Sequence, residues 1–176
     1  MVAPIRHRPS PNALFRELMR TTPFQPATNY WRGAELGVVV DEGFPDGLFL
    51  DLGCGDGKLT EVLVEAMQWQ GRAIGVDIDP HETALARDRT RIYRRVHTGS
   101  AASIPEADET FDFVFSNSVL EHIPDIDEVL REAARVLKRG GCFLFTVPGP
   151  EFHACLAGHG GDATERLRYL ADVDRR

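Results

Sequence analysis

Apolar residues along this chain form five short runs, and stretches with the spacing of amphipathic helices separate them. A short apolar run bounded by turn residues is typical of a buried strand, whereas apolar residues every three to four positions indicate a helix. The expected strands are 48–52, 75–77, 96–99, 111–116 and 142–147. Strands that alternate with helices form parallel sheets with right-handed connections. We therefore expect an α/β fold: a doubly wound parallel sheet of order 3-2-1-4-5 with flanking helices.

Residues that favour helix ends mark several of the intervening helices. The expected helices are 12–20, 29–42, 58–65, 80–86 and 125–138. Asn12 is a candidate N-cap of the first helix, and Pro23 and Pro26 are expected to end it. Pro80 suits the first position of the fourth helix, and Gly140 suits the end of the fifth.

The turn between the first expected strand and its helix is rich in glycine. It reads Asp51-Leu52-Gly53-Cys54-Gly55-Asp56-Gly57. Glycines at alternate positions permit positive φ angles and leave no Cβ to keep a ligand away from the backbone. A strand, a glycine-rich turn and a helix form a small-molecule site in doubly wound sheets. The sequence therefore predicts a ligand in contact with this turn.

The spacing of the turn narrows the choice of ligand. The dinucleotide fingerprint is G-x-G-x-x-G, whereas this chain has G-x-G-x-G. A phosphate-binding loop requires a glycine where Leu52 stands and a hydroxyl where Leu59 stands. Asp77 ends the next expected strand, where a carboxylate accepts hydrogen bonds from ribose hydroxyls. We expect a ligand that carries a ribose, and nothing here requires a pyrophosphate.

Three further segments continue the pattern: Gly75-Val76-Asp77-Ile78, Phe111-Asp112-Phe113-Val114-Phe115-Ser116 and Arg135-Val136-Leu137-Lys138-Arg139-Gly140-Gly141. In this order and spacing, the turn and these segments resemble the successive motifs of the class I S-adenosylmethionine-dependent methyltransferases, over roughly residues 30–150. The resemblance implies a Rossmann-like fold and S-adenosylmethionine as cofactor, with S-adenosylhomocysteine as product. It also implies in-line transfer of a methyl group to an acceptor.

The resemblance assigns roles to individual residues. Asp51 is expected to order the turn and to face the methionine amino group, Asp77 to bind the ribose, and Ile78 and Ala101 to pack on the adenine. The complete expected cofactor-binding set is Asp51, Gly53, Cys54, Gly55, Gly57, Asp77, Ile78, Ser100, Ala101 and Asn117. Ser100 stands where the family typically has an acidic residue, so adenine recognition is expected to depend more on apolar walls and on the Ala101 backbone.

His122 follows the fourth expected strand and is the histidine closest to the predicted crevice, which makes it the candidate general base. The other interpretation is that His122 holds its loop in place. Tyr30 or Arg32, in the second expected helix, either reaches the carboxylate of the ligand or packs structurally. A basic cluster over 87–95 either meets a phosphate or forms a solvated helix face.

Composition limits the class of partner. The chain has 176 residues and a formal net charge of −7, which argues against nucleic acid as the principal partner. Its three cysteines, Cys54, Cys142 and Cys155, form no C-x-x-C pair, and no apolar run reaches the ~20 residues of a membrane span. We expect a cytoplasmic protein with free thiols, no metal site and a small-molecule acceptor.

The expected organisation has three parts: an N-terminal arm and capping helix over 1–28, a methyltransferase core over 29–150, and the start of a substrate-side insert or a truncated C-terminal part over 151–176. The resembled fold normally ends with two more strands beside the fifth, and none is readable here. An open edge beside the fifth strand would favour a homodimer.

Two other classes of function stay open at this stage. A non-catalytic module would bind S-adenosylmethionine without turnover. A nucleotide-dependent oxidoreductase would use the same strand, turn and helix, although the third glycine of its fingerprint is misplaced.

Overall fold

The computed structural model describes residues 8–149, in which strands and helices alternate. The strands are β1 (Leu48–Leu52), β2 (Arg72–Asp77), β3 (Tyr93–Thr98), β4 (Phe111–Asn117) and β5 (Leu137–Thr146). The helices are α1 (Pro11–Thr21), α2 (Pro26–Glu42), α3 (Lys58–Ala66), α4 (Pro80–Arg87), α5 (Ile126–Val136) and the short 3-10 helix η1 (Leu120–His122). None of these described helices is long and apolar enough to cross a membrane.

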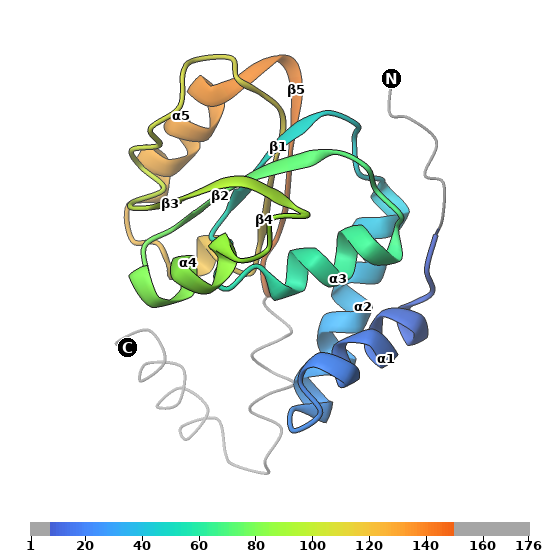
Figure 1. The fold of residues 1–176 in the computed structure, drawn as a ribbon. Coiled ribbons are helices and arrows are strands. Elements are labelled where there is room, and N and C mark those ends of the chain that lie inside the picture. The colour runs from blue at the N-terminus through green and yellow to red at the C-terminus, as the bar shows by residue number, and fades with distance from the viewer. Residues whose placement is uncertain (1–7, 150–176) are drawn as a thin grey trace, which may run out of the picture. The chain divides into compact units, whose positions relative to one another are not determined.

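The five strands form one parallel sheet of order β3-β2-β1-β4-β5, which confirms the predicted topology (Figure 1). In its register, Asp51 lies beside Gly75 on β2 and beside Phe115 on β4. The carboxyl ends of β1, β2 and β4 therefore meet at the same edge of the sheet, where doubly wound folds bind ligands.

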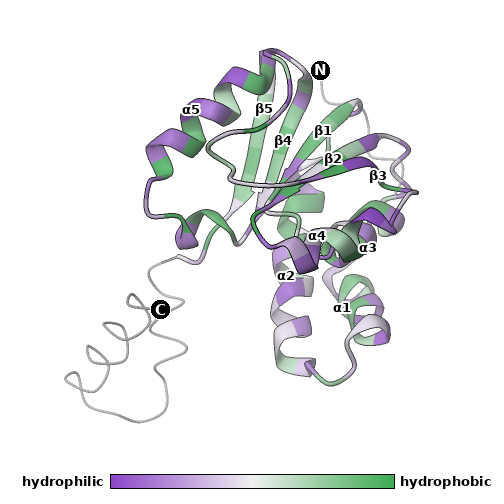
Figure 2. Cartoon of the chain, turned by 60° about the vertical axis from the view of Figure 1, so that its left-hand side comes forward, coloured by the Kyte–Doolittle hydropathy of each residue, from purple (hydrophilic) through white to green (hydrophobic). Residues whose placement is uncertain are grey.

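Both faces of the sheet are covered by apolar side chains. Phe49 and Phe113 pack in the cluster formed with α1, α2, α3 and α4, while Leu50 and Val114 pack in the cluster formed with α5. The three inner strands, β2, β1 and β4, are accordingly rich in hydrophobic residues (Figure 2). A sheet buried on both faces gives near-continuous apolar strands, which explains why the strand positions were predictable.

Two helix boundaries near the amino terminus differ from the prediction. Ser10, rather than Asn12, caps α1, because its hydroxyl accepts a hydrogen bond from the Ala13 amide at 3.3 Å. Pro11 then occupies the first helical position. Pro26 was expected to end the first helix but instead opens α2.

The end of the fifth helix also differs. The helix was expected to continue past Val136 with Gly140 at its end, but it stops at Val136 and β5 begins at Leu137. The Thr110 amide donates to the Val136 carbonyl at 2.8 Å, and Leu137 pairs with Phe111 on β4. Pairing with β4 therefore draws the chain into the sheet one residue after the helix.

The apolar run of the fifth strand predicted a buried strand, but most of β5 is exposed or half-buried. Within the described residues β5 lies at the edge of the sheet, and Phe145 is 47% exposed. The expectations for residues 1–7 and 150–176 lie outside the described residues, including part of the arm and the proposed insert. The three-part division of the chain and the homodimer remain proposals.

Candidate functional site

A cavity of about 500 Å³ opens at the carboxyl edge of the sheet. Its walls come from the glycine turn after β1, the end of β2, the loop after β3, the segment after β4 and the first turn of α5. This volume lies within the ~300–1,000 Å³ of typical small-molecule sites.

The glycine turn is fixed to β2 by hydrogen bonds. The amides of Gly53 and Cys54 both donate to the Val76 carbonyl, at 2.8 and 3.1 Å. Gly53 and Gly55 have φ angles of 76° and 51°, a region that L side chains rarely adopt. A Cβ on Gly55 would meet nothing nearer than 3.9 Å, so open space lies beside its backbone.

Asp77 joins the end of β2 to this turn. One carboxylate oxygen accepts from the Gly55 amide at 2.8 Å, and the other accepts from the Asp79 amide at 2.9 Å. A carboxylate oxygen has two lone pairs, so each retains one for another donor. Because Asp77 also lines the cavity, it can accept hydrogen bonds from a ligand while it holds the turn.

Asp51 faces away from the cavity. It is 2% exposed, and its Oδ2 accepts from the Thr60 hydroxyl at 2.7 Å and from the Tyr93 hydroxyl. Burial raises the pKa of Asp51 to about 6 and also raises the pKa of Tyr93, which therefore remains a donor. Through these two hydrogen bonds, Asp51 links β1 to α3 and to β3.

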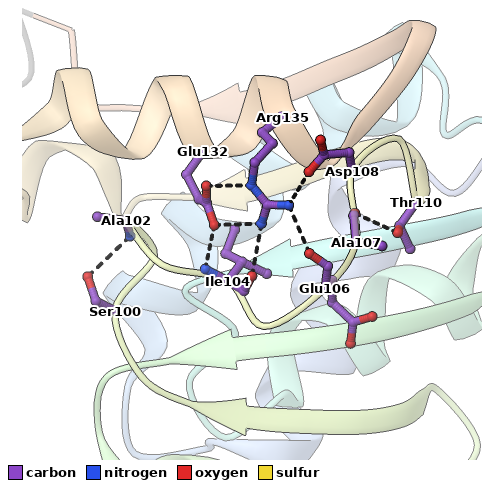
Figure 3. A network of polar contacts seen from close by, with 9 residues as sticks. All are labelled: Ser100, Ala102, Ile104, Glu106, Ala107, Asp108, Thr110, Glu132 and Arg135. Carbon is purple, nitrogen blue, oxygen red and sulfur yellow. Dashed lines mark hydrogen bonds and ion pairs between the residues drawn. The ribbon is translucent and has the colours of Figure 1, made fainter.

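Arg135 on α5 holds the loop that follows β3 (Figure 3). Its guanidinium donates to the carbonyls of Ile104 and Glu106 at 3.0 and 2.9 Å, and to the Asp108 carboxylate at 2.6 Å. Glu132 binds Arg135 through both carboxylate oxygens, at 2.7 and 2.8 Å, and accepts from the Ile104 amide at 2.7 Å. Hydrogen bonds from Arg135 lower the pKa of Glu132.

This pair of residues sets one wall of the cavity. The loop that it holds begins with Ser100, Ala101 and Ala102, which line the cavity, and Glu128, one turn before Glu132, lines it from the helix. The Ser100 hydroxyl accepts from the Ala102 amide at 3.1 Å, which fixes the start of the loop.

The other end of the cavity is formed by the residues after β4. Ser118 lines the cavity and has a φ of 52°, which is uncommon for a residue other than glycine. Arg32 on α2 donates to the Ser118 hydroxyl at 2.8 Å and approaches Asn117 Oδ1 at 3.5 Å. Tyr30, by contrast, is 67% exposed and packs edge-on against Phe15.

His122 lines the cavity but is held loosely. Its side chain is 77% exposed, and Nε2 lies 3.8 Å from a Glu121 oxygen, beyond hydrogen-bond distance. The arginines over 87–95 make contacts outside the cavity: Arg89 donates to the Asp56 carbonyl at 2.6 Å, and Arg87 donates to the Thr98 hydroxyl at 2.7 Å.

The expected site residues therefore divide into two groups. Those that line the cavity are Gly53, Asp77, Ile78, Ser100, Ala101 and His122. Those that do not are Asp51, Cys54, Gly55, Gly57 and Asn117. Ser118 and Glu128 also line the cavity but were not predicted from the sequence. The position of Ser118 directly after Asn117 could have indicated it. Glu128 could not be distinguished from the other polar residues on the exposed face of its helix.

Replacing Asp51 with Asn should change how stability depends on pH. An ordinary Asp has a pKa of 3.8 and Asp51 one of about 6, so unfolding releases a proton between these values. Stability therefore falls as pH rises through this window. The amide does not titrate and keeps an acceptor oxygen for Tyr93. Between about pH 4 and 7, the wild type should lose roughly 2–3 kcal/mol more than Asp51→Asn in urea unfolding; parallel profiles would contradict this.

Replacing Arg135 with Met should free the loop after β3. The amides of Ala102 and Ile104 should then exchange with deuterium about tenfold faster or more, because the bonds that close the loop onto α5 are lost. Hydrogen exchange followed by NMR measures this. Arg139→Met is the control, since that side chain is 94% exposed and pairs with Glu109. Equal protection of the loop in both variants would contradict the role of Arg135.

Comparison with known proteins identifies the family. Residues 50–145 match the model of a methyltransferase domain. A demethylmenaquinone methyltransferase of Shouchella clausii is 38% identical over 96 residues, which cover 52% of this chain and 41% of the relative. An arsenite methyltransferase of Aquipseudomonas alcaligenes is 35% identical over 108 residues, which cover 55% and 31%. The chain thus spans less than half the length of these curated relatives.

Solved structures agree with the fold. The YcgJ protein of Bacillus subtilis superposes with a TM-score of 0.55 at 28% identity, covering 64% of this chain and 49% of that one. The PH0226 protein of Pyrococcus horikoshii gives a TM-score of 0.61 at 23% identity, covering 89% and 68%. Since the family model spans more than half of the sequence and the sheet has the predicted order, the chain belongs to the class I S-adenosylmethionine-dependent methyltransferase domains.

Proposed function

We propose that this protein transfers a methyl group from S-adenosylmethionine to a small-molecule acceptor. The observation that carries the proposal is that Gly53 and Asp77 line one cavity, while the Asp77 carboxylate also holds the Gly55 amide, whose backbone lies beside open space. Three features there suit the donor: room beside the backbone, a carboxylate with free lone pairs, and apolar walls.

Each part of the donor has a counterpart among the cavity residues. Asp77 would accept hydrogen bonds from the ribose hydroxyls. Ile78, which is 76% exposed, offers an apolar surface for the adenine opposite Ala101. The methionine end would lie toward Gly53, and the residues after β4 would face the acceptor. Asp51, which accepts from Thr60 and Tyr93, would hold the start of the turn in place rather than bind the amino group of the donor.

Methyl transfer requires mainly that the protein orient the two reactants. The bound donor supplies an activated methyl group on a positively charged sulfur, so the chain must mainly hold the acceptor in line with it. Proximity and orientation are worth up to ~7–11 kcal/mol in well-aligned systems. Three parts of the chain can orient the reactants: the glycine turn after β1, the loop after β3 and the residues after β4.

A hydroquinone is the acceptor we propose first. The relatives include demethylmenaquinone methyltransferases and an arsenite methyltransferase. Arsenic(III) is thiophilic, but of the two cysteines in the described residues, Cys54 is buried and Cys142 lies exposed on β5. The described part of the chain therefore brings no pair of thiols to the cavity, whereas its apolar walls suit a flat aromatic acceptor. We also propose that the protein acts in the cytoplasm, consistent with these free thiols.

Asp77→Ala should weaken binding of S-adenosylhomocysteine by roughly 10- to 100-fold, because hydrogen bonds to a charged group contribute about 1.5–3 kcal/mol each. Titration calorimetry measures the affinity. Asp79→Ala is the matched control: this neighbouring carboxylate caps α4 and does not line the cavity. Affinity of Asp77→Ala within twofold of wild type, or an equal loss in Asp79→Ala, would contradict the ribose assignment.

Methyl transfer itself is tested with donor labelled in the methyl group. The protein is incubated with 1,4-dihydroxynaphthalene, arsenite and an amine, and labelled products are separated. We expect label on the dihydroxynaphthalene. Binding of S-adenosylhomocysteine without transfer to any acceptor would favour a non-catalytic module, and absence of binding would refute the proposal.

A further inference from the structure

A second cluster of polar side chains lies beside the proposed donor site. Arg32 and Glu35 come from α2, Asn117 and Ser118 from the end of β4 and the residue after it, and Thr146 from the end of β5. The side chains of Glu35 and Arg32 are 12% and 25% exposed, so the cluster is largely shielded from water. The donor contacts proposed above do not use it.

Glu35 is the centre of this cluster. Its Oε1 accepts from the Ser118 hydroxyl at 2.8 Å and from the Thr146 hydroxyl at 2.7 Å, while Oε2 pairs with Arg32 at 2.8 Å. A carboxylate held by three donors from three elements has a fixed position. The paired guanidinium also offsets its charge, so the cluster as a whole adds little repulsion or attraction toward a cationic donor.

Ser118 is the member of the cluster that reaches the cavity. Its hydroxyl donates to Glu35 and accepts from Arg32, and a serine oxygen has two lone pairs. One lone pair therefore remains for a donor that enters the cavity, which Ser118 lines. The Thr146 oxygen differs, since it donates to Glu35 and already accepts from Asn117 and from the Ser118 amide.

The backbone of Ser118 supports the same conclusion. Its φ of 52° costs a serine on the order of 1 kcal/mol or more, and such conformations persist where the surroundings hold them. Here the amide donates to the Thr146 carbonyl at 3.0 Å and the hydroxyl is held from both sides. The strained backbone holds Ser118 at the cavity wall, and the proton of its hydroxyl is directed to Glu35.

Building on the proposed function, we propose that Ser118 and Glu35 form a proton relay for the methyl acceptor. A lone pair of the acceptor forms the bond to the methyl carbon, and the carbon–sulfur bond breaks with its electron pair left on sulfur. The proton of the acceptor O–H or N–H passes to Ser118 Oγ, and the Ser118 proton passes to Glu35 Oε1. The charge lost at the sulfonium reappears as the proton that neutralises Glu35.

This assignment differs from the base expected from the sequence. His122 also lines the cavity, but its ring is largely exposed and its distance to Glu121 does not fix its orientation. The Ser118 hydroxyl is oriented at both its donor and its acceptor sides. Ser118 touches the acceptor in this scheme, and Glu35 acts through Ser118.

The first test measures turnover with 1,4-dihydroxynaphthalene as acceptor. Glu35→Gln and Ser118→Ala should each lower kcat by about 100-fold, the low end for general acid–base catalysis, while S-adenosylhomocysteine affinity stays within twofold. Asp41→Asn is the control, an exposed carboxyl on the same helix. Ser118→Gly removes the hydroxyl and relieves the φ strain, so it provides a folded variant should Ser118→Ala be unstable.

The second test does not depend on turnover. Calorimetry with 1,4-dihydroxynaphthalene should show about tenfold weaker binding to Ser118→Ala than to wild type, because the hydrogen bond to Ser118 is lost. The dimethyl ether, 1,4-dimethoxynaphthalene, has no O–H to donate and should bind both proteins equally. A purely structural role for Ser118 would weaken both ligands alike.

The outcomes separate the relay from the proposed function. If the wild type transfers methyl groups and Glu35→Gln and Ser118→Gly retain kcat within threefold, the relay is wrong and the methyltransferase function stands. If the wild type binds no S-adenosylhomocysteine, the proposed function fails and the relay fails with it. The relay and the proposed function are both supported if the Glu35 and Ser118 variants lose kcat at unchanged S-adenosylhomocysteine affinity, and if Ser118→Ala weakens binding of the dihydroxynaphthalene but not of its dimethyl ether.

Discussion

The hydrogen bond from the Gly55 amide to the Asp77 carboxylate joins the ends of β1 and β2, and the geometry of the site depends on it. Together with the two amides that donate to the Val76 carbonyl, it fixes the glycine turn against β2. Asp77 also lines the cavity. A ligand that binds Asp77 therefore meets a backbone that is already in position, so little entropy is lost in ordering the turn on binding.

The cavity is held from both faces of the sheet. On the α5 face, Arg135 and Glu132 fix the loop that begins with Ser100 and Ala101. On the α2 face, Glu35 fixes Ser118. These supports lie outside the cavity wall or at its edge, and each spans elements far apart in the sequence. The site is thus a property of the packed sheet and helices rather than of the glycine turn alone.

Several features could be predicted from the sequence because their causes are local or strongly periodic. Buried parallel strands are near-continuous apolar runs, so the strand order followed from their positions and the connection rules. The three glycines of the turn and the acidic end of β2 are adjacent to strands whose ends are easy to place. The start of α4 was also predictable, since Pro80 occupies its first position.

Other features depend on tertiary contacts that no local pattern reveals. The last turn of α5 gives way to β5 because β4 offers a pairing partner at Phe111. Asp51 turns toward Tyr93, a residue 42 positions away, so its side-chain direction was not readable from the turn. Ser118 and Glu35 are separated by 83 positions. Glu35 thereby connects α2 to the ends of β4 and β5.

The central claim is that the glycine turn and the end of β2 hold the adenosyl donor, and amide NMR tests it most directly. Titration of the ¹⁵N-labelled protein with S-adenosylhomocysteine should shift the amides of Gly53, Gly55, Ile78 and Ala101, while that of Arg139, near the opposite end of the sheet, stays in place. Saturable binding that left Gly53, Gly55 and Ile78 unshifted and moved amides elsewhere would contradict the account.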